Sequence, residues 1–259
     1  MKLSIIIVNY KSRAYLEKCL ISIFAKIDAG IDFEVIVVNN DAEQEIVALT
    51  EAFPKVRVMQ NQKNSGFGSA NNFGAKEAKG EVLFFLNPDT EVSSGKISSV
   101  LEEFSKDVDL GILGAKLINP DSTVQKWIAG GEVSLWRIIG NNFCMIRDKK
   151  YWQSSEETSV AWVAGTAMFA RKKLFLELGG FDEQFFMYFE DTDLCRRMRL
   201  FGKNVLYFPA FSVLHHGGKS FSEKNKQKKA YYLSQERYFK KHRGNFEFLL
   251  LRFLRFFSF

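Results

Sequence analysis

The chain has 259 residues, of which 46% are hydrophobic and 25% are charged, and this is ample for one large domain with an appended tail. Its three cysteines show no CxxC spacing, which argues against a disulfide framework and favours reduced thiols in a cytoplasmic protein. The formal net charge of +6 indicates an affinity for anions, among which nucleic acid, anionic lipid and sugar-diphosphate donors all qualify.

The first sixty residues alternate between strand and helix patterns. An apolar run from Leu3 to Asn9 has the β-branched content of a buried parallel strand, and it is too short for a signal peptide or a membrane span. Residues 12–24 have helical spacing, the strand pattern returns at Phe33 to Val38 and Val56 to Gln60, and a weaker helix is expected from Glu43 to Phe53. This order predicts a parallel sheet with right-handed crossovers, in the style of nucleotide-binding folds.

A glycine-rich segment from Asn64 to Gly74 follows the third of these strands. Gly66 and Gly68 stand beside a predicted helix start, where the backbone can approach a ligand and the amides of a first helical turn attract anions. The segment is neither a GxGxxG fingerprint nor a P-loop. A loop that merely turns the chain is the alternative.

The stretch Asn87-Pro88-Asp89 follows an apolar strand from Glu81 to Leu86 and is the first candidate for a site. Pro88 disfavours a helical conformation on the residue before it, so Asp89 is expected at the tip of the strand. The carboxyl ends of buried strands are where open α/β sheets bind ligands. An ordinary turn is the alternative, because these residue types are common in turns.

The middle of the chain is less regular. A helix is predicted from Gly95 to Lys106 and a strand from Gly111 to Leu117, whereas residues 119–157 show no clear period and are interpreted as a variable segment over the site. Three tryptophans of this segment can stack on sugar or pack in the core, and packing is favoured for all three: Trp127, Trp136 and Trp152.

Two further elements precede a second candidate for a site. Val160 to Ala170 is predicted as a strand, with a bulge or a close approach to a ligand at Gly165-Thr166, and a short helix follows from Arg171 to Leu178.

The second candidate is the acidic start of the next helix. Leu194, Met198 and Phe201 share a helical face, which puts Glu190 and Asp191 at the amino end of this helix. Because the helix dipole favours charged carboxylates there, we expect them to stay ionised at neutral pH and to be able to accept a proton. Simple capping is the alternative.

A closing strand is predicted from Asn204 to Phe208, with Pro209 ending it. The loop after Val213 contains His215 and His216, which lack the HExxH spacing and become interesting as metal ligands only if another segment supplies a carboxylate. Asp89 could supply one.

The last part of the chain is predicted to form a tail of two helices. Residues 224–241 form a basic helix, and the chain beyond Gly244 is rich in phenylalanine and too interrupted by arginine to span a bilayer. One side of this second helix would carry Leu250, Phe253, Leu254 and Phe257, a composition suited to lying in a membrane interface. A helix docked on the domain, or a helix that pairs with a second copy, is the alternative.

Several motifs together resemble a known family. They are residues 5–10 (IIIVNY), Asn64-x-Gly66-Phe67 through Asn72 and Gly74, Leu86-Asn87-Pro88-Asp89, Gly179-Gly180-Phe181-Asp182-Glu183, Glu190-Asp191-x-Asp193-Leu194 and His215-His216-Gly217-Gly218. From Leu3 to about Ser220 the chain resembles family 2 glycosyltransferases, and within them the bacterial rhamnosyltransferases of polysaccharide and O-antigen assembly. The resemblance implies the GT-A fold, a Rossmann-like and mostly parallel α/β sheet flanked by helices, with a C-terminal helical tail. It divides the chain into a domain of residues 1–220, with a nucleotide-binding half (1–117) and an acceptor-side half (118–220), and a tail of residues 221–259.

The resemblance also implies roles for the candidate residues. Asp191 would be the general base, and Asp89 with His215 would hold Mg²⁺ or Mn²⁺, with the side-chain oxygen of Asn87 nearby. Only one acid of the usual DxD-type pair is present, since the motif here is Asn87-Pro88-Asp89. Glu190 would support the base or bind the acceptor.

The remaining implied contacts are with the donor. Asn9 and Asn39 would lie against the nucleoside, although many relatives carry an aspartate where this chain has Asn39. Further contacts with the donor are implied for Asn64, Gly66, Asn72 and, through a phosphate, Lys219. Asp182 and Asp193 are expected either to cap helices or to contact the acceptor.

The implied activity is inverting transfer of a sugar, with L-rhamnose from dTDP-rhamnose as the first expectation, to a saccharide or lipid-linked saccharide. A UDP-hexose or UDP-N-acetylhexosamine donor is an alternative, and so is a non-catalytic protein that binds nucleotide sugar or nucleic acid. Carboxylates at the strand tips would repel a polyanion, so we expect no nucleic-acid partner. The protein is expected in the cytoplasm, peripheral at the inner face of the cell membrane, with a homodimer as a further alternative.

Overall fold

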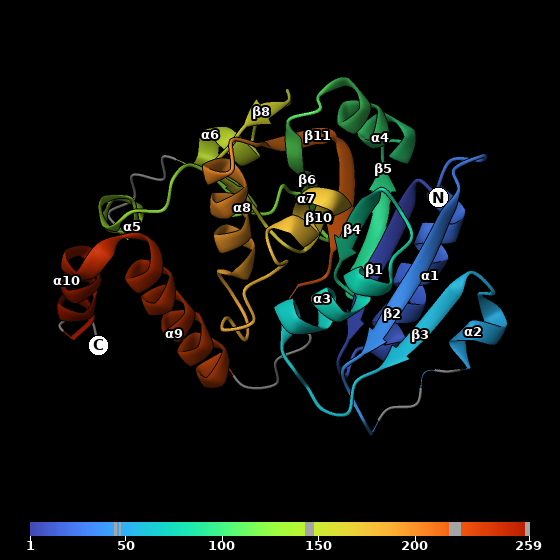
Figure 1. The fold of residues 1–259 in the computed structure, drawn as a ribbon, viewed down its shortest axis with the longest axis horizontal. Coiled ribbons are helices and arrows are strands. Elements are labelled where there is room, and N and C mark those ends of the chain that lie inside the picture. Colours follow the sequence, from blue (N-terminus) through green and yellow to red (C-terminus); the bar gives the residue numbers. More distant parts are fainter. Residues whose placement is uncertain (44–45, 47, 143–147, 218–223, 257–259) are drawn as a thin grey trace.

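A computed structural model describes residues 1–43, 46, 48–142, 148–217 and 224–256 (Figure 1). The strands are β1 (Leu3–Asn9), β2 (Phe33–Asn39), β3 (Val56–Gln60), β4 (Val82–Leu86), β5 (Thr90–Ser94), β6 (Leu110–Ile118), β7 (Ala129–Gly130), β8 (Thr158–Ser159), β9 (Trp162–Val163), β10 (Ala167–Arg171) and β11 (Asn204–His215). The helices are α1 (Arg13–Lys26), α2 (Leu49–Ala52), α3 (Phe67–Glu77), α4 (Ile97–Lys106), α5 (Leu135–Asn142), α6 (Lys149–Trp152), α7 (Lys172–Glu177), α8 (Glu190–Leu200), α9 (Lys224–His242) and α10 (Gly244–Phe256).

One large mixed sheet organises the molecule, with strand order β3-β2-β1-β4-β10-β6-β11-β5 and with β8 paired to β11. The first half is parallel, since β1 pairs in parallel with β2 and β4, and β2 with β3. This confirms the predicted parallel arrangement. The second half is mixed, because β10 runs antiparallel to β4 and β6, and β11 pairs antiparallel with β5.

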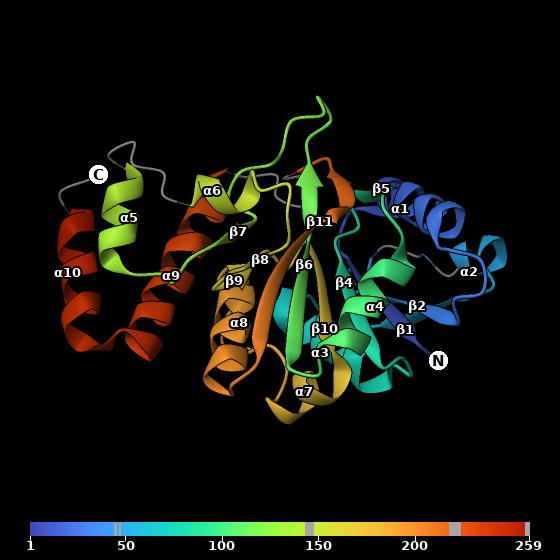
Figure 2. The ribbon, with the colours of Figure 1, turned by 90° about the horizontal axis from the view of Figure 1, so that it is seen from above.

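The core explains why the first strands are continuous apolar runs rather than alternating ones. Every residue of β2 and of β4 is buried, because α1 and α3 cover opposite faces of this part of the sheet (Figure 2). Across the centre of the sheet, the rings of Phe84 and Phe169 stack with centroids 3.8 Å apart, and Phe211 meets both edge-on. Burying each such ring stabilises the fold by roughly 2–3 kcal/mol.

The sequence-based prediction was wrong at the closing strand. Pro209 does not end it, and β11 continues to His215. The register against β6 shifts between Phe208 and Ser212, so the proline falls in an irregularity where a missing N–H breaks no ladder bond. Beyond that point β11 also pairs with β5, an unpredicted strand that begins directly after Asp89.

Three smaller predictions were also wrong. The expected strand of residues 160–170 is divided into β9 and β10, because the chain turns at Gly165. The expected helix of residues 43–53 is helical only over Leu49–Ala52, although residues 44–45 and 47 lie outside the described part. The segment 119–157 contains α5 and α6, and Trp136 on α5 is 76% exposed rather than packed.

The two C-terminal helices fold back onto the domain instead of extending from it (Figure 1). A separate apolar cluster joins them to α5 and to the loop before α8, and its buried members are Leu135, Phe185, Phe189, Tyr238, Phe239 and Leu251. Leu250 and Leu254, expected on the membrane side of the tail, are partly buried against this cluster. Phe257 lies outside the described residues. Among the helices of the described ranges, none is both long and apolar enough to cross a membrane.

Candidate active site

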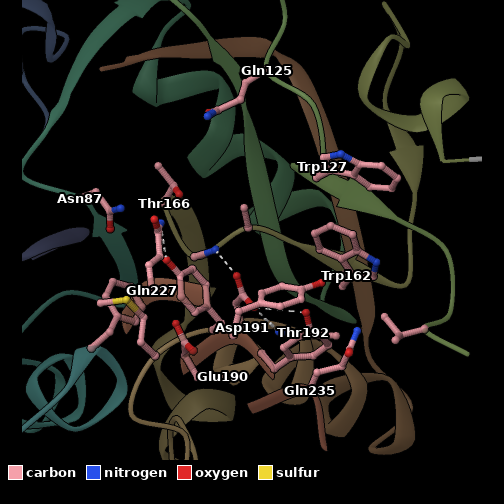
Figure 3. A pocket seen from close by; sticks show the side chains of 18 of the residues that line it. Asn87, Gln125, Trp127, Trp162, Thr166, Glu190, Asp191, Thr192, Gln227 and Gln235 are labelled. Carbon is pink, nitrogen blue, oxygen red and sulfur yellow. Dashed lines mark hydrogen bonds between the residues drawn. The ribbon is translucent and has the colours of Figure 1, made fainter. Parts of the chain in front are cut away.

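A cavity of about 660 Å³ lies where the two halves of the sheet and helix α9 meet (Figure 3). Five of the predicted site residues line it, and they come from three distant segments: Asn87, Asp89, Glu190, Asp191 and His215. The acids at positions 89 and 191, separated by about a hundred residues of sequence, therefore share one cavity.

Asp89 and His215 form one end of the site. Asp89 is 4% exposed, and the Nε2 atom of His215 lies 3.4 Å from its Oδ1 atom. The two residues are held together by the β5–β11 ladder, in which His215 pairs with Thr90, and by a bond from the backbone N–H of His216 to the carbonyl of Asp89. The missed strand β5 thus places the histidine beside the aspartate.

The tautomer of His215 fits a metal ligand. Its Nδ1 atom lies 2.8 Å from Oε1 of Gln125, and in the neutral tautomer that donates from Nδ1 to this oxygen the Nε2 lone pair faces Asp89. A lone pair and a carboxylate repel each other unless a proton or a cation lies between them. No group of three or more His, Cys, Asp or Glu side chains with metal-binding geometry occurs in the described ranges.

Glu190 and Asp191 are aimed into the cavity by a strained turn. Tyr188 and Phe189, just before α8, have φ values of +68° and +66°, a left-handed conformation that side chains with a Cβ rarely adopt. Oδ2 of Asp191 accepts a bond from the N–H of Gly165 at 2.8 Å, and Oδ1 accepts bonds from the N–H and hydroxyl of Thr192. The turn at Gly165 that divides the predicted strand therefore fixes the Asp191 carboxylate.

Burial changes the protonation expected for the two acids. Burial raises the pKa of Asp191 above its ordinary value, although the bonds from Gly165 and Thr192 lower it. Burial, with the charge of Asp191 as the second cause, raises the pKa of Glu190 well above its ordinary value, and its Oε2 atom has no hydrogen-bond partner in the described part of the chain. The expectation that the helix dipole sets the protonation of both acids does not hold for Glu190, because desolvation opposes the ionised form that the dipole favours.

The predicted donor contacts Asn9 and Asn39 lie outside the cavity lining. Both side chains are fully buried, and Nδ2 of Asn9 donates to Oδ1 of Asn39 at 2.9 Å. Asn39 in turn donates to Oε1 of Gln60 at 2.8 Å, so the pair joins the ends of β1, β2 and β3. Contact with a nucleoside stays a prediction for both.

The other predicted donor contacts also lie behind the cavity wall. Oδ1 of Asn64 accepts a bond from the N–H of Gly66, whose backbone runs so close to Phe186 that an added Cβ would lie 2.6 Å from its carbonyl oxygen. Asn72 forms a pair of 2.8 Å bonds with the backbone of Phe181 and so ties α3 to the loop before α8. Lys219 lies outside the described residues.

Asp193 fastens α9 to α8. It is fully buried and accepts from Arg197, Lys241 and His242 at 2.6–2.7 Å. Although burial opposes ionisation, the bond from His242 and the charges of Arg197 and Lys241 lower the pKa of Asp193 to about 2. Asp182 also pairs with Lys241, so of the two expected roles for these acids the structure supports a structural one.

The sequence-based analysis missed the contribution of α9 to the cavity. Gln227, Tyr231 and Gln235 line it from one face of this helix. Their spacing of four residues is a signal in the sequence, since such residues share a helical face, but the same segment also has the lysine content of a basic helix. Gln125 was also missed, and no local pattern marks it.

Comparisons with known proteins identify the family and the fold of the chain. Residues 4–207 match the sequence profile described as Glycosyl transferase family 2. The chain is similar to the N-acetylglucosaminyl-diphospho-decaprenol L-rhamnosyltransferase of Mycobacterium tuberculosis, with 27% identity over 84% of this chain and 77% of that protein. It is also similar to the rhamnosyltransferase WbbL of Escherichia coli, with 30% identity over 61% of this chain and 65% of that protein.

Solved structures show the same fold. A crystal structure of GalNAc-T7 with UDP, GalNAc and Mn²⁺ superimposes with a TM-score of 0.68 at 17% identity, over 86% of this chain and 44% of that one. The mannosyltransferase PcManGT of Pyrobaculum calidifontis, in complex with GDP-Man and Mn²⁺, gives a TM-score of 0.65 at 14% identity, over 93% of this chain and 63% of that one. The expected GT-A fold with a helical C-terminus is confirmed. With the profile covering most of its length, the chain belongs to the family 2 glycosyltransferases.

Proposed function

We propose that this glycosyltransferase inverts the anomeric centre of its donor sugar, depends on a divalent cation, and transfers L-rhamnose from dTDP-rhamnose to a saccharide or lipid-linked saccharide in polysaccharide assembly. The observation that carries the proposal is that Asp191 and the Asp89–His215 pair line one cavity large enough for a sugar. Rhamnose is supported by the two similar proteins that are named rhamnosyltransferases.

Asp191 performs the proton transfer in this scheme. As the acceptor hydroxyl attacks the anomeric carbon, the carboxylate takes the hydroxyl proton. The bonds from Gly165 and Thr192 hold both carboxylate oxygens in place, so that the base does not need to reorganise during attack. Attack from the face opposite the diphosphate inverts the configuration.

Asp89 and His215 act at the leaving group. Their facing oxygen and nitrogen atoms, with Nδ1 of His215 fixed by Gln125, fit Mg²⁺ or Mn²⁺, and a histidine ligand shifts the preference toward Mn²⁺. A bound cation would offset the negative charge that grows on the departing diphosphate. Two similar structures contain Mn²⁺, which supports this assignment.

The proposal is tested by offering the purified protein a panel of nucleotide sugars, namely dTDP-rhamnose, UDP-galactose, UDP-N-acetylglucosamine and GDP-mannose. We expect slow release of dTDP from dTDP-rhamnose that requires Mn²⁺ or Mg²⁺ and stops with EDTA. Faster turnover of a UDP sugar would identify that sugar nucleotide as the donor in place of dTDP-rhamnose. The absence of any nucleotide release, together with tight binding of single-stranded RNA, would contradict an enzymatic function.

We also propose that one face of α10 rests on the inner surface of the cell membrane. Phe246, Leu249 and Phe253 share this face and are 78%, 59% and 59% exposed, while the opposite face is buried through Leu251. Exposed lysines and arginines of α9 and α10, within a chain of net charge +6, supply attraction to anionic lipid.

Replacing Phe246, Leu249 and Phe253 together by serine is expected to weaken binding to phosphatidylglycerol vesicles by about 100-fold or more, since each side chain contributes about 1 kcal/mol or more. Vesicle flotation measures this, with donor hydrolysis as the check on folding. These three positions are preferred to a deletion after Gly244, which would also remove the buried Leu251. If the triple variant floats with vesicles as the wild type does, and ultracentrifugation shows that a wild-type dimer has become a monomer, this face is a homodimer interface and not a membrane contact.

A further inference from the structure

We propose that Trp127, Trp162, Tyr231 and Gln235 form the binding site for the acceptor sugar ring, so that α9 is part of the active site and not only a tail. The proposal rests on the function proposed above and extends it to the second substrate. All four residues line the cavity that holds Asp191. Figure 3 shows Trp127, Trp162 and Gln235 on one side of Asp191 and Asn87, beside the leaving-group end, on the other.

The two tryptophans provide an apolar wall with fixed orientation. Trp127 is 42% exposed although its ring lies against that of the buried Trp152, with centroids 5.0 Å apart, and its φ is +61°. The surrounding structure thus holds it in a conformation that a side chain rarely adopts. The ring of Trp162 lies so close to Gly130 that a Cβ there would be 2.7 Å from Nε1. Such flat, partly open rings suit the apolar face of a pyranose.

The opposite wall is polar and comes from α9. Tyr231 packs against Tyr188 and Phe189, with ring centroids 5.7 and 5.4 Å apart, yet it remains 41% exposed toward the cavity that it lines. Gln235 is 4% exposed and reaches the same cavity. A tyrosine hydroxyl and an amide both donate and accept, which is what recognition of sugar hydroxyls needs.

The C-terminal helix α10 fixes Gln235 from behind. Arg255 donates to the side-chain oxygen of Gln235, and at 2.9 Å to Glu236. The guanidinium also lies 4.4 Å from the ring centroid of Tyr232. Because its oxygen is held in this way, Gln235 can present its amide nitrogen to a ligand without losing rotamer freedom on binding.

One buried polar side chain in the cavity lining independently indicates a ligand that carries hydroxyl groups. Glu190 is 95% buried, its carboxyl group points into the cavity (Figure 3), and Oε2 has no hydrogen-bond partner in the described ranges. Buried polar groups are nearly always paired, so the carboxyl group of Glu190 is expected to bond to a bound molecule.

The test uses the chain of 259 residues and the donor that the panel of nucleotide sugars identifies. Methyl pyranosides of glucose, galactose, mannose, rhamnose and N-acetylglucosamine serve as acceptors. At least one is expected to accelerate nucleotide release and to quench tryptophan fluorescence. Trp127→Ala and Gln235→Met are expected to raise the KM for that acceptor about 10-fold and about 5-fold.

Matched control variants separate binding from folding. Trp136→Ala removes an exposed tryptophan that does not line the cavity, and Lys229→Ala changes an exposed position of α9; both should keep the wild-type acceptor KM. Melting temperatures identify any variant that is merely unstable. Two results would show that the proposed acceptor site is wrong: no glycoside has an effect, or Trp127→Ala and Gln235→Met keep the wild-type acceptor KM. If the donor is still hydrolysed in either case, the proposed function is unaffected. Absence of donor hydrolysis in the wild type overturns the proposed function itself.

Discussion

Asp191→Asn should bind the donor as the wild type does and transfer its sugar about 10²- to 10⁴-fold more slowly. The amide has nearly the same shape as the carboxylate, and its oxygen can still accept from Gly165 or Thr192. It cannot take a proton from the acceptor hydroxyl. The loss is therefore expected in kcat for transfer, whereas the Kd for the nucleotide, measured by calorimetry, stays unchanged.

A matched control for this variant is Asp121→Asn. Asp121 accepts from the N–H and hydroxyl of Thr123, much as Asp191 does from Thr192, but it lies on an exposed turn outside the cavity. This control should transfer sugar at the wild-type rate. If Asp191→Asn itself remains active, the base lies elsewhere, and Glu190 would be the first residue to replace.

The pH profile gives a further readout of the same base. Only the ionised carboxylate accepts a proton, so the wild-type kcat should fall as the pH falls through the pKa of Asp191. Burial raises that pKa above the ordinary value of 3.8, so the acidic limb should lie at a higher pH than for an exposed aspartate. The residual rate of Asp191→Asn should lack this limb. A wild-type limb centred at or below 3.8 would contradict the burial of the base.

Asp89→Asn is expected to lower metal-dependent donor hydrolysis by about 10²- to 10³-fold, because removing an electrostatic contact to a developing charge typically has this effect. The substituted amide keeps the size of the side chain and loses the charge that, with His215, would hold the cation. Hydrolysis measured against increasing Mn²⁺ should show a much weaker apparent affinity for the metal.

Two histidine variants complete this experiment. His215→Ala should behave like Asp89→Asn. His216→Ala should not, because His216 does not line the cavity and its Nε2 atom instead lies 2.7 Å from Glu91. If donor hydrolysis depends on Mn²⁺ equally in the wild type and in Asp89→Asn, Asp89 is not a metal ligand.

Local sequence patterns were sufficient for most of the first half of the fold. Strands such as Leu3–Asn9 and Val82–Leu86 are nearly continuous apolar runs because both faces of the sheet are covered, and such runs are visible without tertiary information. The same patterns failed in the second half. Pro209 indicates the end of a strand by its missing donor, yet β11 passes it through a register shift that depends on the neighbouring strands β5 and β6.

The candidate site also has features that local sequence shows and features that only tertiary structure decides. The residue types of Asp89, Glu190, Asp191 and His215, and their places at the ends of elements, were readable from the sequence. Their protonation was not, because the helix dipole is a local property whereas burial is a tertiary one, and burial raises the pKa of Glu190. The role of Asp193 was likewise decided by Lys241 and His242, about fifty residues away.

The sequence by itself determined most of the helices and strands and the reactive residue types at their ends, since periodicity and turn residues act within about ten positions of the chain. Only the tertiary structure decided which of these terminal residues face one another. The pairing of His215 with Asp89 depends on β5 and on Gln125, and the second wall of the cavity depends on α9 folding back through the buried charges around Asp193. Contacts between residues so distant in sequence leave no local pattern, because they exist only once the sheet has formed.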